Sequence, residues 1–422
     1  MKLTARSFES RTFYARAVLP FIWIPLGFLL LVPVLGNTPL VPWNMNNWPL
    51  LERGVPIAWL LVAGSMALFA RFSQASIPFS VLMAWCFIRT AMADFPVRPI
   101  QIILLMLTVG TLYVAARGMS TQHARLFMWS LSLGVSVELV LGYLNLFKIY
   151  PWMSWVVPDQ VGRAMGLLTH PNYWGSLMAL ALPAMWSLVG PIAVVAIMVP
   201  VVLSYSAGPV ISALSGIVVC AWPELGKKMK YLLIAGSSAV AVGVMQVHEW
   251  RLNGRREIWQ AIWPEILKYP FKGQGLGDWR VWADHYNHKI SLASGKPEVF
   301  ASLQAHNEIY QVLFELGMIG VAIVGYMALQ AAVCSVVVWK HQTRTPRWYL
   351  QPVCVERAWL AVVVVACVNS LVSPTFHLPA QAAIAMFALA RVQYHAVRYE
   401  TLVEEAGNKV AGKGRRKGKD NA

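Results

Sequence analysis

Arg255 and Arg256 are adjacent arginines that open a long polar stretch in a sequence that is otherwise strongly apolar. They lie at the predicted start of a helix, where the first backbone N–H groups also favour an anion. A guanidinium can bind a phosphate through two parallel hydrogen bonds, so the pair is suited to a diphosphate. Anchoring of the helix to anionic lipid headgroups is the alternative role for the same arginines.

His306, next to Asn307, marks the other end of this stretch, where the chain returns to an apolar run. A histidine can be neutral near pH 7 and can then accept a proton from a sugar hydroxyl. A histidine at such a boundary can equally be a hydrogen-bonded polar residue with no part in chemistry. We interpret His306 as a candidate base and Asn307 as a residue that supports it.

Residues 258–267 carry apolar side chains at helical spacing and predict an amphipathic helix after the two arginines. The predicted apolar face contains Trp259, Ile262, Trp263 and Ile266. Such a helix lies on the membrane surface or against the rest of the protein.

Two glycine patterns follow this helix. Residues 273–277 read Gly-Gln-Gly-Leu-Gly, which superficially resembles a nucleotide-binding loop. No strand is predicted before them and the sequence contains no GK[ST], so we predict a turn that returns the chain to the membrane. Gly317 and Gly320, in the apolar run after His306, have a spacing that allows close packing of helices.

Motifs for metal or nucleophile chemistry are absent from the sequence, which has no HExxH, GxSxG or DxD pattern. Its five cysteines form no CxxC pair and fall in apolar runs or in predicted cytoplasmic loops. We therefore expect chemistry without a metal ion, a cofactor or a structural disulfide.

The elements that must position these residues are membrane spans. With 57% hydrophobic and 13% charged residues, the chain is far more apolar than a soluble domain, in which about a quarter of the residues are charged. We predict an all-α, polytopic membrane protein with about twelve transmembrane helices and one large outer loop that contains the amphipathic helix. The predicted spans are 17–36, 54–70, 77–93, 99–116, 126–147, 172–188, 190–206, 208–222, 231–247, 308–339, 358–373 and 377–394.

The distribution of Lys and Arg predicts the orientation, because these residues collect in cytoplasmic loops. With the N-terminus inside, most of the 35 Lys and Arg residues fall in cytoplasmic segments and both termini are cytoplasmic. The net charge of +16 then reflects topology and a basic tail, and we expect no nucleic-acid partner. The apolar run that begins at Val18 is predicted to be a retained anchor.

The chain divides into four predicted regions. Residues 1–247 form transmembrane helices 1–9, 248–305 the large outer loop, 306–394 helices 10–12, and 395–422 a disordered basic cytoplasmic tail. The end of the tail is rich in Gly and Lys and too polar to pack, so we expect it to be disordered.

Several cations lie on the outer side of the predicted membrane, against the positive-inside rule. Arg163 belongs to a second outer segment, Arg89 lies near the outer end of a span, and His377 begins the last span. Binding of an anionic substrate would explain their position. Arg89 and Arg163 are therefore further candidates for diphosphate binding, and His377 is a supporting residue.

Together, these motifs resemble the O-antigen ligase and polymerase superfamily of bacterial envelope glycosyltransferases. The matching features are His306-Asn307 with Gly317-x-x-Gly320, the block from Arg255-x-x-x-Trp259 through Pro270 to Gly277, and Gly166 to Asn172 before a span. At motif level the resemblance covers roughly 160–322, and the layout of spans with one large outer loop extends it to the whole chain.

The resemblance implies a reaction at the periplasmic face of the bacterial inner membrane, in the large periplasmic loop. The implied donor is a glycan on undecaprenyl diphosphate, and the implied acceptor is lipid A–core or a second lipid-linked glycan, with no nucleotide or metal. It further implies that Arg255 binds the diphosphate and that His306 activates or positions the acceptor. The supporting residues are Trp259, Asn307, Gly317 and Gly320.

One departure from the family concerns the end of the span before the large loop. Members often carry a Ser-Arg pair there, whereas Ser206 is followed by Ala207. A second contact to the phosphates would then come from Arg163, Arg256 or Arg89. An O-antigen ligase is the main hypothesis and a polymerase of the same superfamily the alternative. A flippase or transporter is more distant, because it predicts charges deep in the spans rather than at their ends.

Overall fold

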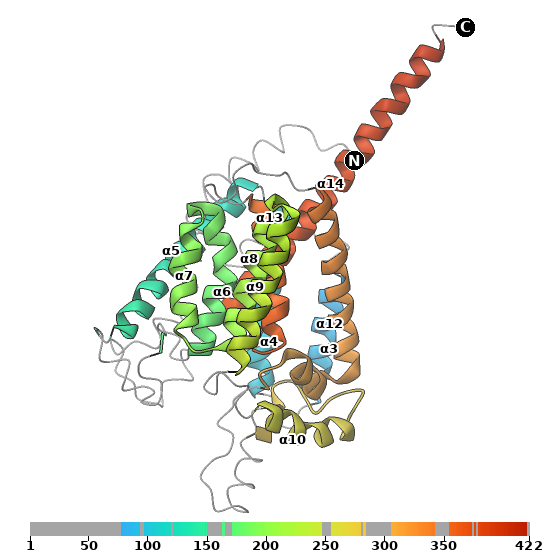
Figure 1. The fold of residues 1–422 in the computed structure, drawn as a ribbon. Coiled ribbons are helices and arrows are strands. Elements are labelled where there is room, and N and C mark those ends of the chain that lie inside the picture. Colours follow the sequence, from blue (N-terminus) through green and yellow to red (C-terminus); the bar gives the residue numbers. More distant parts are fainter. Residues whose placement is uncertain are drawn as a thin grey trace, which may run out of the picture.

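Helices make up all the regular secondary structure of the part of the chain that the structure describes (Figure 1). The structure, a computed structural model, describes residues 77–92, 97–119, 121–147, 149, 163–164, 171–246, 255–279, 282–283, 305–341, 354–373, 375–376 and 379–419. The first two predicted spans, 17–36 and 54–70, lie outside the described residues, as does His377.

Each predicted span within the described residues coincides with a helix, which confirms the all-helical class. The helices are α3 (Ile77–Ala91), α4 (Val97–Gly118), α5 (Thr121–Leu146), α6 (Pro171–Val189), α7 (Ile192–Val202), α8 (Ala207–Ala221), η5 (Trp222–Glu224), α9 (Lys227–Gln246), α10 (Arg255–Lys268), α12 (Glu308–His341), α13 (Val355–Ser370) and α14 (Pro379–Lys419). The predicted break between α6 and α7 is also present, at Gly190 with φ of 83° and Pro191 at the N-cap. The number of membrane crossings and their sides stay predictions.

The centre of the molecule is formed by α6, α8, α13 and α14, which we call the helix core. Nearly all of α6 is buried, and α8 and α13 pack on it and on each other. Small residues allow this close approach: a Cβ on Gly216 of α8 would lie 2.7 Å from Val365 of α13. Aromatic rings fill the remaining space, as where Phe387 stacks on Phe127.

Apolar side chains also cover the outside of the molecule, most clearly on α12. Two described helices, α12 and the part of α5 from Phe127 to Leu146, are long and apolar enough to cross a membrane. Only 11% of the apolar stretch of α12 is buried, and Leu329 and Val333 are 60% and 57% exposed. The core helix of a soluble protein would be mostly buried, so this surface favours contact with lipid.

The last helix, α14, is longer than predicted. It runs from Pro379 to Lys419 and continues beyond the bundle (Figure 1). The prediction of disorder from the tail composition is therefore wrong for the backbone up to Lys419. A helix that already packs in the core extends without a new nucleation step, and Lys, Arg, Glu and Ala all have good helix propensity.

Candidate functional site

The amphipathic helix α10 packs against the first turns of α12 at one end of the bundle (Figure 1). Ile258, Ile262 and Ile266 form its buried face and join Phe314 of α12 in one apolar cluster. The predicted helix is confirmed, and it lies on the rest of the protein. The buried face of the helix differs from the predicted one in two residues. Trp263 is 47% exposed, and Ile258, which the predicted face did not include, is buried in the cluster.

Trp259 connects α10 to the residue before His306. Its indole Nε1 donates a hydrogen bond to the carbonyl of Ala305 at 2.9 Å. The same ring stacks on Tyr310 of α12, with 5.4 Å between ring centroids. One aromatic side chain therefore holds the start of α10 and the start of α12 together.

Arg255 and Arg256 form the first turn of α10, one turn before Trp259. Four residues of helix rise about 6 Å, so this turn directly precedes the residue of α10 that binds the carbonyl of Ala305. The side chains of Arg255 and Arg256 lie outside the described part of the structure. The structure thus brings the two ends of the polar stretch to one place, although about fifty residues separate them in the sequence.

His306 has a left-handed backbone conformation with φ of 53° and a half-buried side chain. This conformation is uncommon for a residue other than glycine and costs on the order of 1–3 kcal/mol. It persists where surrounding contacts determine it, and such positions cluster at functional sites.

Asn307 and Glu308 fix the chain immediately after His306. Oδ1 of Asn307 accepts hydrogen bonds from the backbone N–H groups of Ile309 and Tyr310, and so caps α12. Its Nδ2 donates to the carbonyl of Leu371 at 2.9 Å, and Oε1 of Glu308 accepts from the backbone N–H of Phe376 at 2.6 Å. The start of α12 is therefore bound to the turn between α13 and α14, next in sequence to His377.

The two glycine patterns meet each other. Gly317 breaks α12 with φ of 67°, and the N–H groups of Met318 and Ile319 donate instead to the carbonyls of Pro270 and Phe271. A Cβ on Gly317 would lie 2.2 Å from the carbonyl oxygen of Phe271. The predicted turn at 273–277 is confirmed. Gly317, which was predicted to allow a neighbouring helix to pack closely, instead lies at a kink of α12 and makes room for this turn.

Arg89 is buried beneath this turn. Its Nη2 donates to the carbonyls of Gly273 and Gln274, both at 3.0 Å, and Trp85 one turn earlier donates to the carbonyl of Leu316 at 3.1 Å. With 3% of its surface exposed, Arg89 supports the turn that carries α10. A direct contact of Arg89 with phosphate stays a prediction.

Arg163 lies at a different turn, the one between α7 and α8. Its Nε donates to the carbonyl of Ser204 at 2.8 Å and its Nη2 to that of Tyr205 at 3.1 Å. Ser206, in the same turn, donates to Oδ1 of Asn172 at the start of α6. The guanidinium of Arg163 therefore lies next to the position where the family often carries an arginine after the serine.

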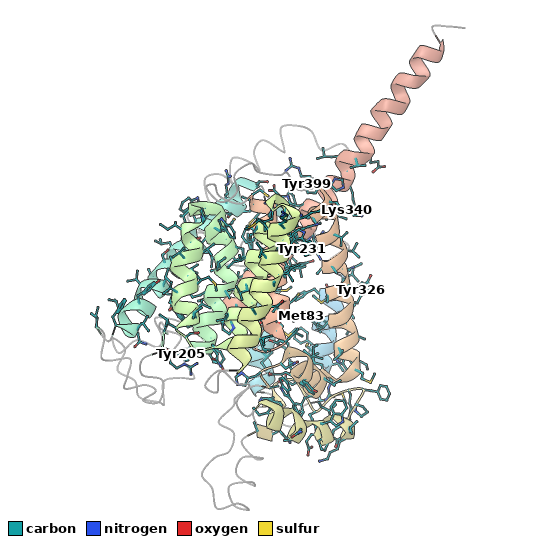
Figure 2. All side chains as sticks on the ribbon, in the orientation of Figure 1. Met83, Tyr205, Tyr231, Tyr326, Lys340 and Tyr399 are labelled. Carbon is teal, nitrogen blue, oxygen red and sulfur yellow. The ribbon has the colours of Figure 1, made fainter. Side chains whose placement is uncertain are left out.

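Both turns lie at the same end of the molecule. Figure 2 shows Tyr205 at the end that also carries α10 in Figure 1, whereas Lys340 and Tyr399 lie at the opposite end. The predicted outer residues Arg163, Arg255 and His306 thus share an end that is opposite the predicted cytoplasmic Lys340. Arg163 contacts the α7–α8 turn, while the residues around His306 belong to α10 and α12.

Several residues at this site were missed by the sequence interpretation. Trp85, Gln311 and Glu315 were assigned to spans as ordinary members, yet each makes a hydrogen bond beside the Gly317 kink or the His306 segment. Gln311 and Glu315 had a usable signal, because polar residues four apart in an apolar helix share one face. Within the described residues, no group of three His, Cys, Asp or Glu side chains is placed to hold a metal ion.

Comparison with known families gives a match to the middle of the chain. Residues 192–325 match the family model described as O-antigen ligase. The chain resembles this family over these residues, in the middle of its sequence. The match supports a place in the O-antigen ligase and polymerase superfamily and suggests a glycosyltransferase-like enzyme in general. A search of curated proteins found no match.

The matched segment begins at the start of α7 and ends within α12, and it makes up about a third of the chain. It contains α10, His306 and both glycine patterns, which are the elements that the structure brings together. Arg89 and Arg163 lie outside the matched residues, although both bind backbone carbonyls of turns inside them.

Proposed function

We propose that this protein is an O-antigen ligase that transfers a glycan from undecaprenyl diphosphate to a hydroxyl of lipid A–core at the periplasmic face of the bacterial inner membrane. The observation that supports this most directly is the hydrogen bond from Trp259 to the carbonyl of Ala305. It holds the first turn of α10, which carries Arg255 and Arg256, beside His306. In this proposal, the cationic site for the diphosphate and the candidate base for the acceptor hydroxyl lie at the same end of α10.

The proposed reaction breaks the bond between the sugar C1 and the diphosphate oxygen and forms a bond from C1 to the acceptor oxygen. His306 accepts the hydroxyl proton. Arg255, Arg256 and the first N–H groups of α10 stabilise the negative charge that develops on the departing undecaprenyl diphosphate. Arg163, at the α7–α8 turn of the same end, is the proposed second contact for the phosphates.

The lipid chain of the donor would lie against the exposed apolar surface of the bundle. Side chains such as Leu329 and Val333 of α12 are more than half exposed, as expected for a lipid-facing helix. The diphosphate head then meets α10 at the membrane surface. We propose that both termini are cytoplasmic, which agrees with Lys340 and the site lying at opposite ends (Figure 2).

The test is glycan transfer by the purified full-length protein in lipid nanodiscs, with lipid-linked donor and lipid A–core. Arg255→Ala and His306→Ala should each lower kcat/KM by about 100-fold or more, because charge stabilisation and proton transfer contribute at that level. Lys268→Ala is the matched control, since this cation lies at the far end of α10 in an exposed pair with Glu265. Full activity of both site variants would refute the proposed roles.

A polymerase of the same superfamily is the second candidate, because the matched family supports the superfamily as a whole. The two reactions share the donor and differ in the acceptor. With a second lipid-linked glycan as the sole acceptor, chain extension would indicate a polymerase, whereas transfer only to lipid A–core indicates a ligase.

A further inference from the structure

Gln311 and Glu315 form a buried polar pair one turn apart in α12, with 3% and 2% of their surfaces exposed. Nε2 of Gln311 donates to Oε1 of Glu315 at 3.1 Å. Oε1 of Gln311 accepts from the backbone N–H of Ala305, also at 3.1 Å. The pair therefore links the interior of α12 to the peptide that precedes His306.

The order of these bonds fixes the orientation of the Gln311 amide. The NH₂ group of Gln311 donates to Glu315, which leaves Oε1 of Gln311 to accept from the N–H of Ala305. Rotation of the amide by half a turn would place two donors against each other at Ala305 and two acceptors against each other at Glu315. Such mismatches are costly for groups this deeply buried.

Ala305 is held on both sides of its backbone. Gln311 of α12 binds its N–H, and Trp259 of α10 binds its carbonyl at 2.9 Å. The residue is fully buried, so neither group has access to solvent as an alternative partner. Side chains from two helices thus fix the position of the peptide that precedes His306, whose backbone is left-handed.

We propose that Gln311, oriented by Glu315, is a positioning residue that aims His306 at the acceptor hydroxyl. This inference rests on the proposed function, in which His306 accepts the acceptor proton. Capping of α12 does not require Gln311, because Asn307 already binds the N–H groups of Ile309 and Tyr310. The contact of Gln311 lies upstream of that cap, on the peptide that leads into His306.

The experiment measures kcat and the KM for donor in full-length protein in nanodiscs, with the undecaprenyl-diphosphate-linked glycan and lipid A–core. Gln311→Leu removes the acceptor for Ala305 and should lower kcat by about 10- to 100-fold, since small displacements of a catalytic group have effects of this size. The KM for donor should change less than about twofold, because no proposed diphosphate contact is altered.

An exchange of the pair provides the sharper variant. Gln311→Glu alone places two carboxylates in contact and should be as impaired as Gln311→Leu. In the double variant with Glu315→Gln, the carboxylate at 311 again accepts from Ala305 and the amide at 315 donates to it. We expect this double variant to recover kcat to within about fivefold of the wild type.

Gln393→Leu is the matched control. Gln393 is equally buried in α14, and its Oε1 accepts from the hydroxyl of Tyr113, in a region of α4 and α14 away from α10. It should lower the thermal unfolding midpoint but leave kcat within about twofold. A purely structural role of Gln311 would give the same result as this control.

Three results separate the possible failures. The inference is overturned if Gln311→Leu keeps the wild-type kcat, or if the double variant is no more active than Gln311→Glu. The proposed function still holds in that case, provided that the wild type transfers the glycan and His306→Ala does not. If Gln311→Leu does not fold, the exchange of Gln311 and Glu315 decides the question. Lack of transfer by the wild type overturns both the proposed function and this inference.

Discussion

Two regions of the molecule are held together in different ways. The helix core of α6, α8, α13 and α14 is packed through small residues and aromatic rings, such as Phe387 of α14 against Trp359 of α13. The re-entry region, defined as residues 255–279 and 305–320, is held by side chains that bind backbone groups, including Trp259, Gln311 and Arg89. Apolar packing tolerates small shifts, whereas hydrogen bonds fix direction.

This difference explains why the candidate chemistry lies at the edge of the fold. The peptide before His306 is bound by two side chains, and the two residues after it are bound to the turn between α13 and α14. A catalytic group must keep its place within a fraction of an ångström. The re-entry region has the contacts needed for this, and we expect substitutions in the two regions to have separable effects on rate and on stability.

The largest effect is expected at the kink of α12. Gly317→Ala places a Cβ 2.2 Å from the carbonyl oxygen of Phe271, at a backbone angle that disfavours alanine, and should lower transfer activity by more than about 100-fold. Gly325→Ala is the control, because nothing lies within 4 Å of its Cβ in the same helix. Kinetics and thermal unfolding of both variants test this. Equal behaviour of the two would show that the kink is dispensable.

A smaller loss of transfer activity is expected when Arg89, which binds the turn at 273–277, is replaced. Arg89→Ala loses two hydrogen bonds from a charged donor, each worth about 1.5–3 kcal/mol, and should lower both stability and kcat, the latter about 10-fold. Arg125→Ala, on the exposed surface of α5, is the control. The KM for donor distinguishes two roles: an unchanged KM indicates turn support alone, and a large rise would show that Arg89 also binds the diphosphate.

The smallest effect on rate is expected in the helix core. Phe387→Leu removes a stacked ring beside Phe127 and Trp359 and should lower the free energy of unfolding by about 1–2 kcal/mol. The kcat measured well below the unfolding temperature should stay within twofold of the wild type. A loss of kcat as large as in Arg89→Ala would contradict the separation of the two regions.

Much of the fold was predictable because it depends on local properties of the chain. The length of apolar runs predicted the helices, and Gly190-Pro191 predicted the break before α7. The spacing of isoleucines and tryptophans predicted α10. The length of α14 was wrongly predicted, since composition alone does not show that a packed helix can extend into a polar tail.

The roles of single polar residues were less predictable. Arg89 and Arg163 were selected as cations on the outer side, and the structure shows each of them bound to the backbone of a turn far away in sequence. Gln311 and Glu315 looked like ordinary residues of a span. Their spacing places them on one helix face and so predicts their contact with each other, but it does not predict that Gln311 binds the backbone of Ala305.

The sequence by itself therefore determined the helical class, the amphipathic helix and the residues at the two ends of the polar stretch. It did so because hydrophobic length, periodicity and charge are properties of neighbouring residues. Only the tertiary structure decided that Arg255 and His306 belong to one place, through Trp259 and Ala305. The physical reason is that a hydrogen bond depends on distance and direction between atoms, and folding brings those atoms together from distant parts of the chain.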